Sequence, residues 1–167
     1  MEKAAIIAKH YPGTKTYYLA ANFPFVDGFP LIPHLSHNDG KKLDLTFYYQ
    51  SIETKEYVTA SPSWIGYGAY ESPKPKEVNW PKRCEEQDYW QYGAIQVLAP
   101  FTSNRRYEVE VVRTRMLLQE MEKTESIQKI FLEPHLVERW KLSALNKIRF
   151  HGCHAVRHDD HIHLQIR

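Results

Sequence analysis

Two short stretches near opposite ends of this 167-residue chain contain side chains that could bind a metal ion. The first is S-H-N-D-G-K-K-L-D-L at 36–45, and the second is H-D-D-H-I-H-L-Q-I-R at 158–167. Together they supply three imidazoles and one carboxylate: His37, Asp44, His161 and His163. Imidazoles and carboxylates are the side chains that catalytic zinc sites use as ligands, and such sites keep one position open for water. We therefore predict a metal site, and with it a hydrolase, assembled when the two ends of the domain fold together.

Strand periodicity places these side chains on polar faces. The C-terminal stretch alternates two sets of residues, one polar and one aliphatic: His161, His163, Gln165 and Arg167 against Ile162, Leu164 and Ile166. A strand over 43–50 alternates in the same way, with Leu43, Leu45 and Phe47 on one face and Asp44, Thr46 and Tyr48 on the other. Successive side chains of a strand point to opposite faces of its sheet. The aliphatic faces therefore anchor both strands while the histidines and Asp44 face a cavity.

The remaining chain predicts the elements that hold these strands. Strands are expected at 16–23, 43–50, 127–132 and 148–167, and helices at 2–10, 104–124 and 134–142. Ser103 or Asn104 would cap the long helix, and Pro134 would open the last one. The predicted fold is a single α+β domain over 1–167, with a central antiparallel sheet that carries the zinc site on one face and helices on the other.

Composition narrows the classes of partner. The net charge is +2, and the 22 basic and 20 acidic residues are mixed along the chain, so no nucleic-acid partner is predicted. The apolar run at 1–13 is too short for a signal peptide or a transmembrane segment. If the protein acts outside the cytoplasm, we expect this sequence to be the mature form, after removal of a signal peptide.

Other features leave alternatives open. Cys84 and Cys153 could form a disulfide in an oxidising compartment or remain two buried thiols. The Pro-rich and aromatic segment 51–90 is either a loop beside a substrate or a surface insertion. Several polar residues are interpreted as ordinary turn, capping or surface residues: His10, Asp39, His135, His151, His154, Asp159 and Asp160. One of the three aspartates could instead orient an imidazole.

The metal-binding pattern resembles a known group of zinc peptidases. His37, then Gly40 and Asp44, followed at a distance by His161-x-His163, is similar to the group that contains lysostaphin, the D-Ala-D-Ala carboxypeptidases and dipeptidases, and the hedgehog signalling domain. The resemblance covers 30–50 and 150–167, whereas the middle of the chain matches only in the order of its elements.

Within this group the chain is most similar to the penicillin-insensitive murein endopeptidases. These carry one extra histidine three residues before the first zinc ligand and another three residues before the His-x-His. His34 and His158 occupy those positions here. The family's enzymes are usually longer, so parts that bind substrate could be absent or replaced by 51–90.

The resemblance implies a role for each matched residue. His37, Asp44 and His163 would bind Zn²⁺, and His161 would be the general base that takes a proton from water and returns it to the leaving amine. His158 or His34 would donate a hydrogen bond to the oxyanion. The implied function is hydrolysis of amide bonds in the peptides of peptidoglycan, in the periplasm or outside the cell.

Two other functions remain open at this stage. One is a D-Ala-D-Ala carboxypeptidase or dipeptidase, which would need a cationic residue for the terminal carboxylate, with Arg105, Arg157 and Arg167 as candidates. The other is a binding module of the hedgehog type that holds zinc without turnover. The oligomeric state is not predicted.

Overall fold

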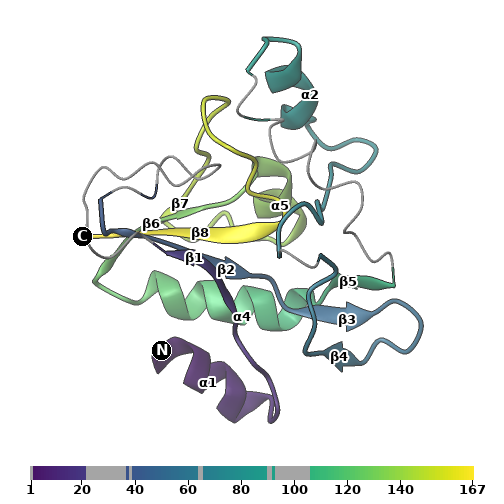
Figure 1. The fold of residues 1–167 in the computed structure, drawn as a ribbon, viewed down its shortest axis with the longest axis vertical. Coiled ribbons are helices and arrows are strands. Elements are labelled where there is room, and N and C mark those ends of the chain that lie inside the picture. The colour runs from purple at the N-terminus through teal and green to yellow at the C-terminus, as the bar shows by residue number, and fades with distance from the viewer. Residues whose placement is uncertain (1, 22–36, 38, 64–65, 90–91, 93–105) are drawn as a thin grey trace.

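The computed structural model describes residues 2–21, 37, 39–63, 66–89, 92 and 106–167. Helices and two β-sheets make up this part of the chain (Figure 1). In chain order the elements are α1 (Glu2–His10), β1 (Tyr18–Ala21), β2 (Lys42–Thr46), β3 (Tyr49–Ser51), β4 (Tyr57–Val58), α2 (Trp80–Glu85), β5 (Tyr107–Val109), α4 (Val111–Glu122), β6 (Ile127–Phe131), α5 (Pro134–Arg139), β7 (Ile148–Arg149) and β8 (His161–Ile166). The predicted mixture of helices and mainly antiparallel strands is confirmed.

The larger sheet has five strands in the order β1-β2-β8-β6-β7. Its central strand β8 pairs antiparallel with β2 on one side and with β6 on the other. The predicted antiparallel pairing holds for the central strands, whereas at one edge β6 and β7 run parallel. That pairing is possible because α5 lies between the two strands in the chain and supplies the crossover that parallel neighbours require.

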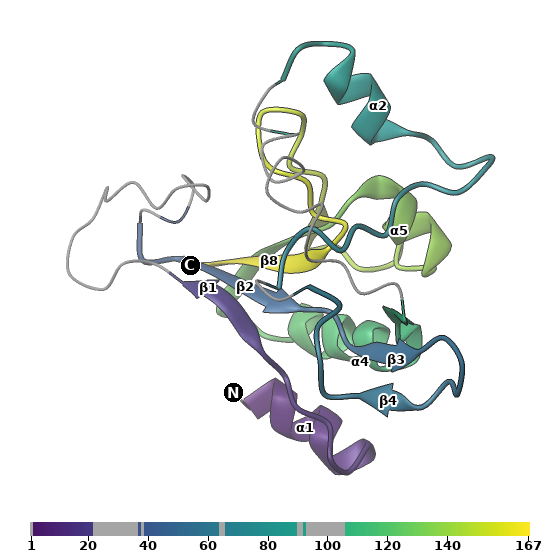
Figure 2. The same ribbon diagram turned by 45° about the vertical axis from the view of Figure 1, so that its right-hand side comes forward.

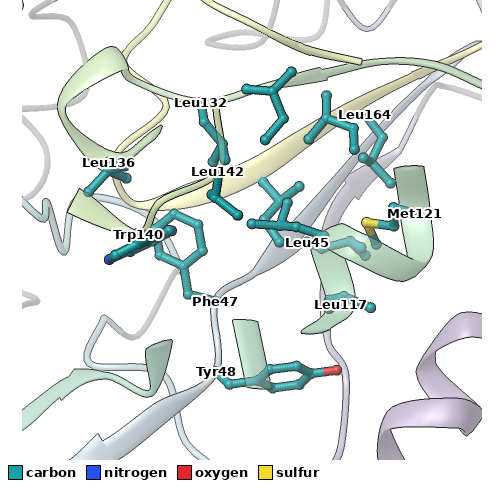
Figure 3. Packing of buried hydrophobic residues seen from close by; sticks show 14 of the residues in the cluster. Leu45, Phe47, Tyr48, Leu117, Met121, Leu132, Leu136, Trp140, Leu142 and Leu164 are labelled. Atoms are coloured by element: carbon teal, nitrogen blue, oxygen red, sulfur yellow. The ribbon is translucent and has the colours of Figure 1, made fainter. Parts of the chain in front are cut away.

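One face of this sheet packs on the hydrophobic core. Leu45, Ile162 and Leu164 extend from β2 and β8, and Leu117 and Met121 from α4 belong to the same buried cluster. Figure 3 shows several of these side chains between the strands and α4. Because burial of large aliphatic side chains is the main favourable term in folding, this layer holds β2 and β8 side by side.

Helices lie on both sides of the sheet. Figure 2 shows α4 along the core face with α1 beyond it, whereas α2 and the loop that precedes β8 rise on the opposite side. The prediction that helices cover only one face was therefore wrong for α2. A disulfide between Cys84 of α2 and Cys153 of the loop connects these two segments and decides between the alternatives left open for the cysteines.

The strand predicted over 43–50 is divided between the two sheets. β2 ends at Thr46, and β3 begins at Tyr49 in a second sheet of order β4-β3-β5. The predicted alternation therefore fails at Tyr48, which joins Phe47 in the core instead of lying on the face of Asp44. The backbone N–H of Tyr48 donates to Thr114 Oγ1 of α4 at 3.2 Å, so it is bonded to the helix and not to a neighbouring strand.

Several predicted boundaries were too generous. The helix predicted over 104–124 begins at Val111, because residues 107–109 pair with β3 and the Glu110 carboxylate caps the helix by accepting from the N–H groups of Val112 and Arg113. Ser103 and Asn104 lie outside the described residues. The helix at 2–10 is confirmed, and the strand predicted over 148–167 is two short strands joined by the loop 150–160.

Candidate metal centre

The register of β2 and β8 places the polar side chains of both strands on the face away from the core. Asp44 lies directly opposite His163, and Thr46 lies opposite His161. Their neighbours Leu45 and Ile162 form the adjacent pair, which faces the core. Side chains directly opposite in an antiparallel pair have Cβ atoms about 5 Å apart, so this register is sufficient to bring Asp44 and His163 together.

His37 completes the group from the segment just before β2. A turn at Asp39 and Gly40 leads from His37 into the strand, with Asp39 Oδ1 accepting the Lys41 N–H at 3.0 Å. Gly40 has φ +71°, a conformation that glycine adopts without steric cost. The turn places His37 Nε2 3.2 Å from Asp44 Oδ1, and His37 is completely buried.

The spacing of the three side chains is compatible with a shared metal ion. Asp44 Oδ1 lies 3.2 Å from His37 Nε2 and 2.9 Å from His163 Nδ1. Ligands at the usual zinc distances of 2.0–2.1 Å are about 3.3 Å apart when arranged tetrahedrally, so the observed spacings are close to those of a ligand set. Within the described residues His163 Nδ1 makes no hydrogen bond of normal geometry, despite its closeness to Asp44. That geometry is expected of atoms that face a common ion.

Electrostatics favour the forms of Asp44 and His163 that bind metal. Burial acts to raise the pKa of the Asp44 carboxyl, but His161, His163 and His37 outweigh burial and hold this pKa well below its usual value. Burial lowers the pKa of His163, against the opposing effect of Asp44. An ionised carboxylate and a neutral imidazole are the states that a metal requires of these residues.

Tyr67 holds the second oxygen of the carboxylate. Its hydroxyl donates to Asp44 Oδ2 at 2.8 Å, and its ring packs edge-on against His161 with centroids 5.0 Å apart. Burial and the neighbouring Asp44 raise the pKa of Tyr67, so the phenol keeps its proton and remains a donor. Oδ1 of Asp44 is thereby directed at the two histidines while Oδ2 is anchored to Tyr67.

His161 lies beside the three potential ligands on the same strand face as His163. Its Nε2 is 3.8 Å from Asp44 Oδ2, and its Nδ1 contacts the carboxylate of Asp160. Burial acts to lower the pKa of His161, but Asp160 and Asp44 outweigh it and raise the pKa to about 9. A divalent cation bound to Asp44 would offset that carboxylate and lower this pKa again.

His158 adds another buried imidazole to the site. Its ring centroid is 5.1 Å from those of both His161 and His163, and these three residues form an alternative group whose nitrogens could share an ion. Burial first, and then the charges of its neighbours, lower the pKa of His158 well below its usual value. The backbone N–H of His158 donates to Oε1 of Glu133 at 3.2 Å. This hydrogen bond ties the loop that contains His158 to the residues that follow β6.

Other residues singled out in the sequence have different surroundings. His34 and Arg105 lie outside the described residues. Arg157 is buried and makes a bidentate ion pair with Asp159, at 3.0 and 2.6 Å, so it does not offer its charge to a substrate carboxylate. His135 was interpreted as a helix-end or surface residue. It lies in the first turn of α5, but it is buried, and its Nε2 lies 2.8 Å from the carbonyl oxygen of Glu71.

Sequence reasoning missed two contributors to the site and left the role of a third open. Tyr67 belongs to the irregular segment 51–90, where nothing in the local pattern separates it from the other tyrosines. Asp160 was interpreted as a turn or capping residue, with a role in orienting an imidazole left open for one of the three aspartates, and its contact with His161 fits that alternative. His151 stacks on Phe131 with centroids 4.2 Å apart and lies 5.9 Å from the His163 ring, so it belongs to the surroundings of the site.

Comparisons with known proteins do not identify the chain. A scan against protein-family models gave no match, and a search of curated proteins gave none either. Among the described residues, no helix has the length and apolar character needed to cross a membrane. The geometry of the buried His/Asp cluster is therefore the basis on which a function is proposed.

Proposed function

We propose that this protein is a zinc-dependent peptidase that hydrolyses amide bonds in the peptide part of peptidoglycan. The observation that carries the proposal is the convergence of His37, Asp44 and His163, with His161 beside them as a third, differently placed imidazole. A set of two imidazoles and one carboxylate matches the preferences of zinc and leaves a position for water. The choice of peptidoglycan as substrate is supported by the sequence resemblance alone.

The roles of the residues follow from their positions. His37, Asp44 and His163 would hold Zn²⁺, which when bound lowers the pKa of a coordinated water to about 7 and polarises a carbonyl group. His161 would accept the proton of the attacking water and return it to the leaving amine. His158, whose ring centroid lies 5.1 Å from that of His161, would donate a hydrogen bond to the oxygen of the scissile carbonyl.

The disulfide supports an extracytoplasmic location. Cys84 and Cys153 are bonded, and structural disulfides persist in oxidising compartments such as the periplasm or the cell exterior. Peptidoglycan is found in these compartments. The proposed site of action is therefore compatible with the proposed substrate.

The test is cleavage of purified peptidoglycan by zinc-loaded protein, with products identified by mass spectrometry. We expect His161→Ala to retain zinc, measured by elemental analysis, and to lose about 10²- to 10⁴-fold in rate, the usual contribution of a general base. His10→Ala, at the exposed end of α1, is the matched control and should keep full activity. Full activity in His161→Ala would refute its assignment as the base.

The products also distinguish the alternatives. New cross-link or stem-peptide fragments would support the peptidase. Release of only a terminal D-alanine would indicate a carboxypeptidase instead. Bound zinc without any product from sacculi, muropeptides or D-Ala-D-Ala would indicate a binding module.

A further inference from the structure

Asp160 is a buried carboxylate with both oxygens in contact with fixed partners. Oδ1 contacts His161 Nδ1, and Oδ2 accepts the backbone N–H of Gly68 at 2.6 Å. The hydroxyl of Tyr49 donates to the Asp160 carbonyl oxygen at 3.4 Å. The side chain therefore has little freedom to rotate.

These contacts determine how His161 is held. An ionised carboxylate only accepts hydrogen bonds, so the His161 nitrogen that faces Asp160 must carry a proton. In the neutral imidazole the lone pair then belongs to the other nitrogen, Nε2, which lies on the side of Asp44, 3.8 Å from Oδ2. The edge of the Tyr67 ring packs against the imidazole and limits its rotation.

The segment Gly66–Gly68 links this arrangement to the potential metal ligands. Gly68 donates its N–H to Asp160, and the adjacent Tyr67 donates its hydroxyl to Asp44. Gly66 and Gly68 both have positive φ, +82° and +85°, which allows the backbone to turn closely over the site. A Cβ atom on Gly66 would lie 2.1 Å from the Leu19 side chain, so this turn also packs against β1.

We propose that Asp160 is a positioning residue that holds His161 in its Nδ1–H tautomer with Nε2 directed at the ligand cluster, and that Gly68 fixes Asp160 for this task. The role of Nε2 as a proton acceptor from water rests on the proposed function. The orientation of the imidazole does not depend on that function, so the positioning role of Asp160 and the proposed function can be refuted separately.

The neighbouring Asp159 has a different place. Its carboxylate pairs with Arg157 and lies 3.5 Å from His135 Nε2, within a buried network that ties the loop before β8 to α5. Because Asp159 and Asp160 are both completely buried, Asp159 is a matched control for loss of a buried charge beside His161.

Asp160→Asn is the informative substitution. An amide has one oxygen where the carboxylate has two, so it cannot accept from both Gly68 N–H and His161 Nδ1–H. If its oxygen stays on Gly68, its NH₂ faces Nδ1 and favours the opposite tautomer, with the proton on Nε2. In the zinc-loaded protein we expect kcat to fall about 10²- to 10⁴-fold, with KM and zinc content close to those of the wild type.

Imidazole NMR tests the orientation without any turnover. In long-range ¹H–¹⁵N spectra of zinc-loaded wild-type protein, the ¹⁵N shifts of His161 should show a protonated Nδ1 and an unprotonated Nε2, and in Asp160→Asn the proton should move to Nε2. Asp159→Asn should lower the melting temperature but leave the His161 tautomer and the kcat of the folded fraction unchanged.

Two results would overturn the proposal. One is a neutral Nε2–H tautomer of His161 in the wild type, a measurement that needs no variant to fold. The other is an unchanged tautomer and kcat in folded Asp160→Asn. If the wild type cleaved no peptidoglycan while its His161 showed the predicted tautomer, the proposed function would fail and the positioning role of Asp160 would stand.

Discussion

Asp44 and His163 lie directly opposite each other on β2 and β8, with Asp44 Oδ1 2.9 Å from His163 Nδ1. Both residues belong to regular strands whose other faces are packed in the core. The separation of these two side chains is therefore fixed by the hydrogen-bonding register of the sheet. Such a rigid scaffold suits a metal site whose ligands are preorganised in the metal-free protein.

Zinc should bind with a stoichiometry of one per chain and stabilise the fold. Ligand binding to the native state alone raises the free energy of unfolding by about 2.7 kcal/mol at 100 times the dissociation constant. Asp44→Asn should abolish this stabilisation, because the amide loses the charge that offsets the cation. Asp39→Asn, in the exposed turn before β2, is the control. The measurements are elemental analysis and thermal unfolding with and without chelator, and equal zinc content in Asp44→Asn would contradict the ligand assignment.

Tyr67→Phe should weaken zinc binding without changing the fold. The variant keeps the packing of the ring on His161 but removes the hydrogen bond to Asp44 Oδ2. Loss of a partner that orients a ligand typically costs about 10- to 100-fold in metal affinity. Competition with a chromophoric chelator measures the change. Tyr18→Phe, which alters a tyrosine that is 74% exposed, should have no effect.

The stability of the protein should depend on pH through Glu133. Burial first, and the charge of Asp159 second, raise the pKa of Glu133 from 4.5 to about 7. Because the folded-state pKa lies above the unfolded value, protonation stabilises the fold. This contribution is full below about pH 4.5 and is lost as the pH rises to about 7.

Glu133→Gln should remove this dependence while retaining an acceptor for the His158 N–H. At pH 8 the variant should be more stable than the wild type by up to about 3 kcal/mol, since each pKa unit corresponds to about 1.36 kcal/mol. At pH 4 the difference should vanish. Urea unfolding at the two pH values measures it, and a difference independent of pH would count against the raised pKa.

The Cys84–Cys153 disulfide should contribute strongly to stability. Its two residues are 69 positions apart, and closing a loop of this length in the unfolded chain corresponds to about 4 kcal/mol in the chain-entropy model. The double substitution Cys84→Ser with Cys153→Ser should lower the free energy of unfolding by about this amount. Dithiothreitol should destabilise the wild type and leave the double variant unaffected, and thiol titration verifies the redox state.

Local patterns were sufficient to predict much of the fold. The strict alternation at 161–167 gave the faces of β8, and Pro134 marked the start of α5 because its ring favours the first turn of a helix. The boundaries failed where tertiary contacts override propensity. Residues 107–109 continue a helical pattern in the sequence. In the structure they form β5 and pair with the edge of β3, because pairing with a neighbouring strand outweighs local propensity.

The sequence by itself determined which side chains could bind a metal. Residue type, spacing and strand alternation singled out His37, Asp44, His161 and His163, and the family resemblance then implied that His161 is not a ligand. Only the tertiary structure decided what surrounds them. The contacts of Tyr67 with Asp44, and of Gly68 with Asp160, join residues that are 23 and 92 positions apart. The physical reason is that alternation specifies the face of a strand, whereas the register of β2 on β8 and the path of the Gly66–Gly68 turn depend on packing of the whole domain.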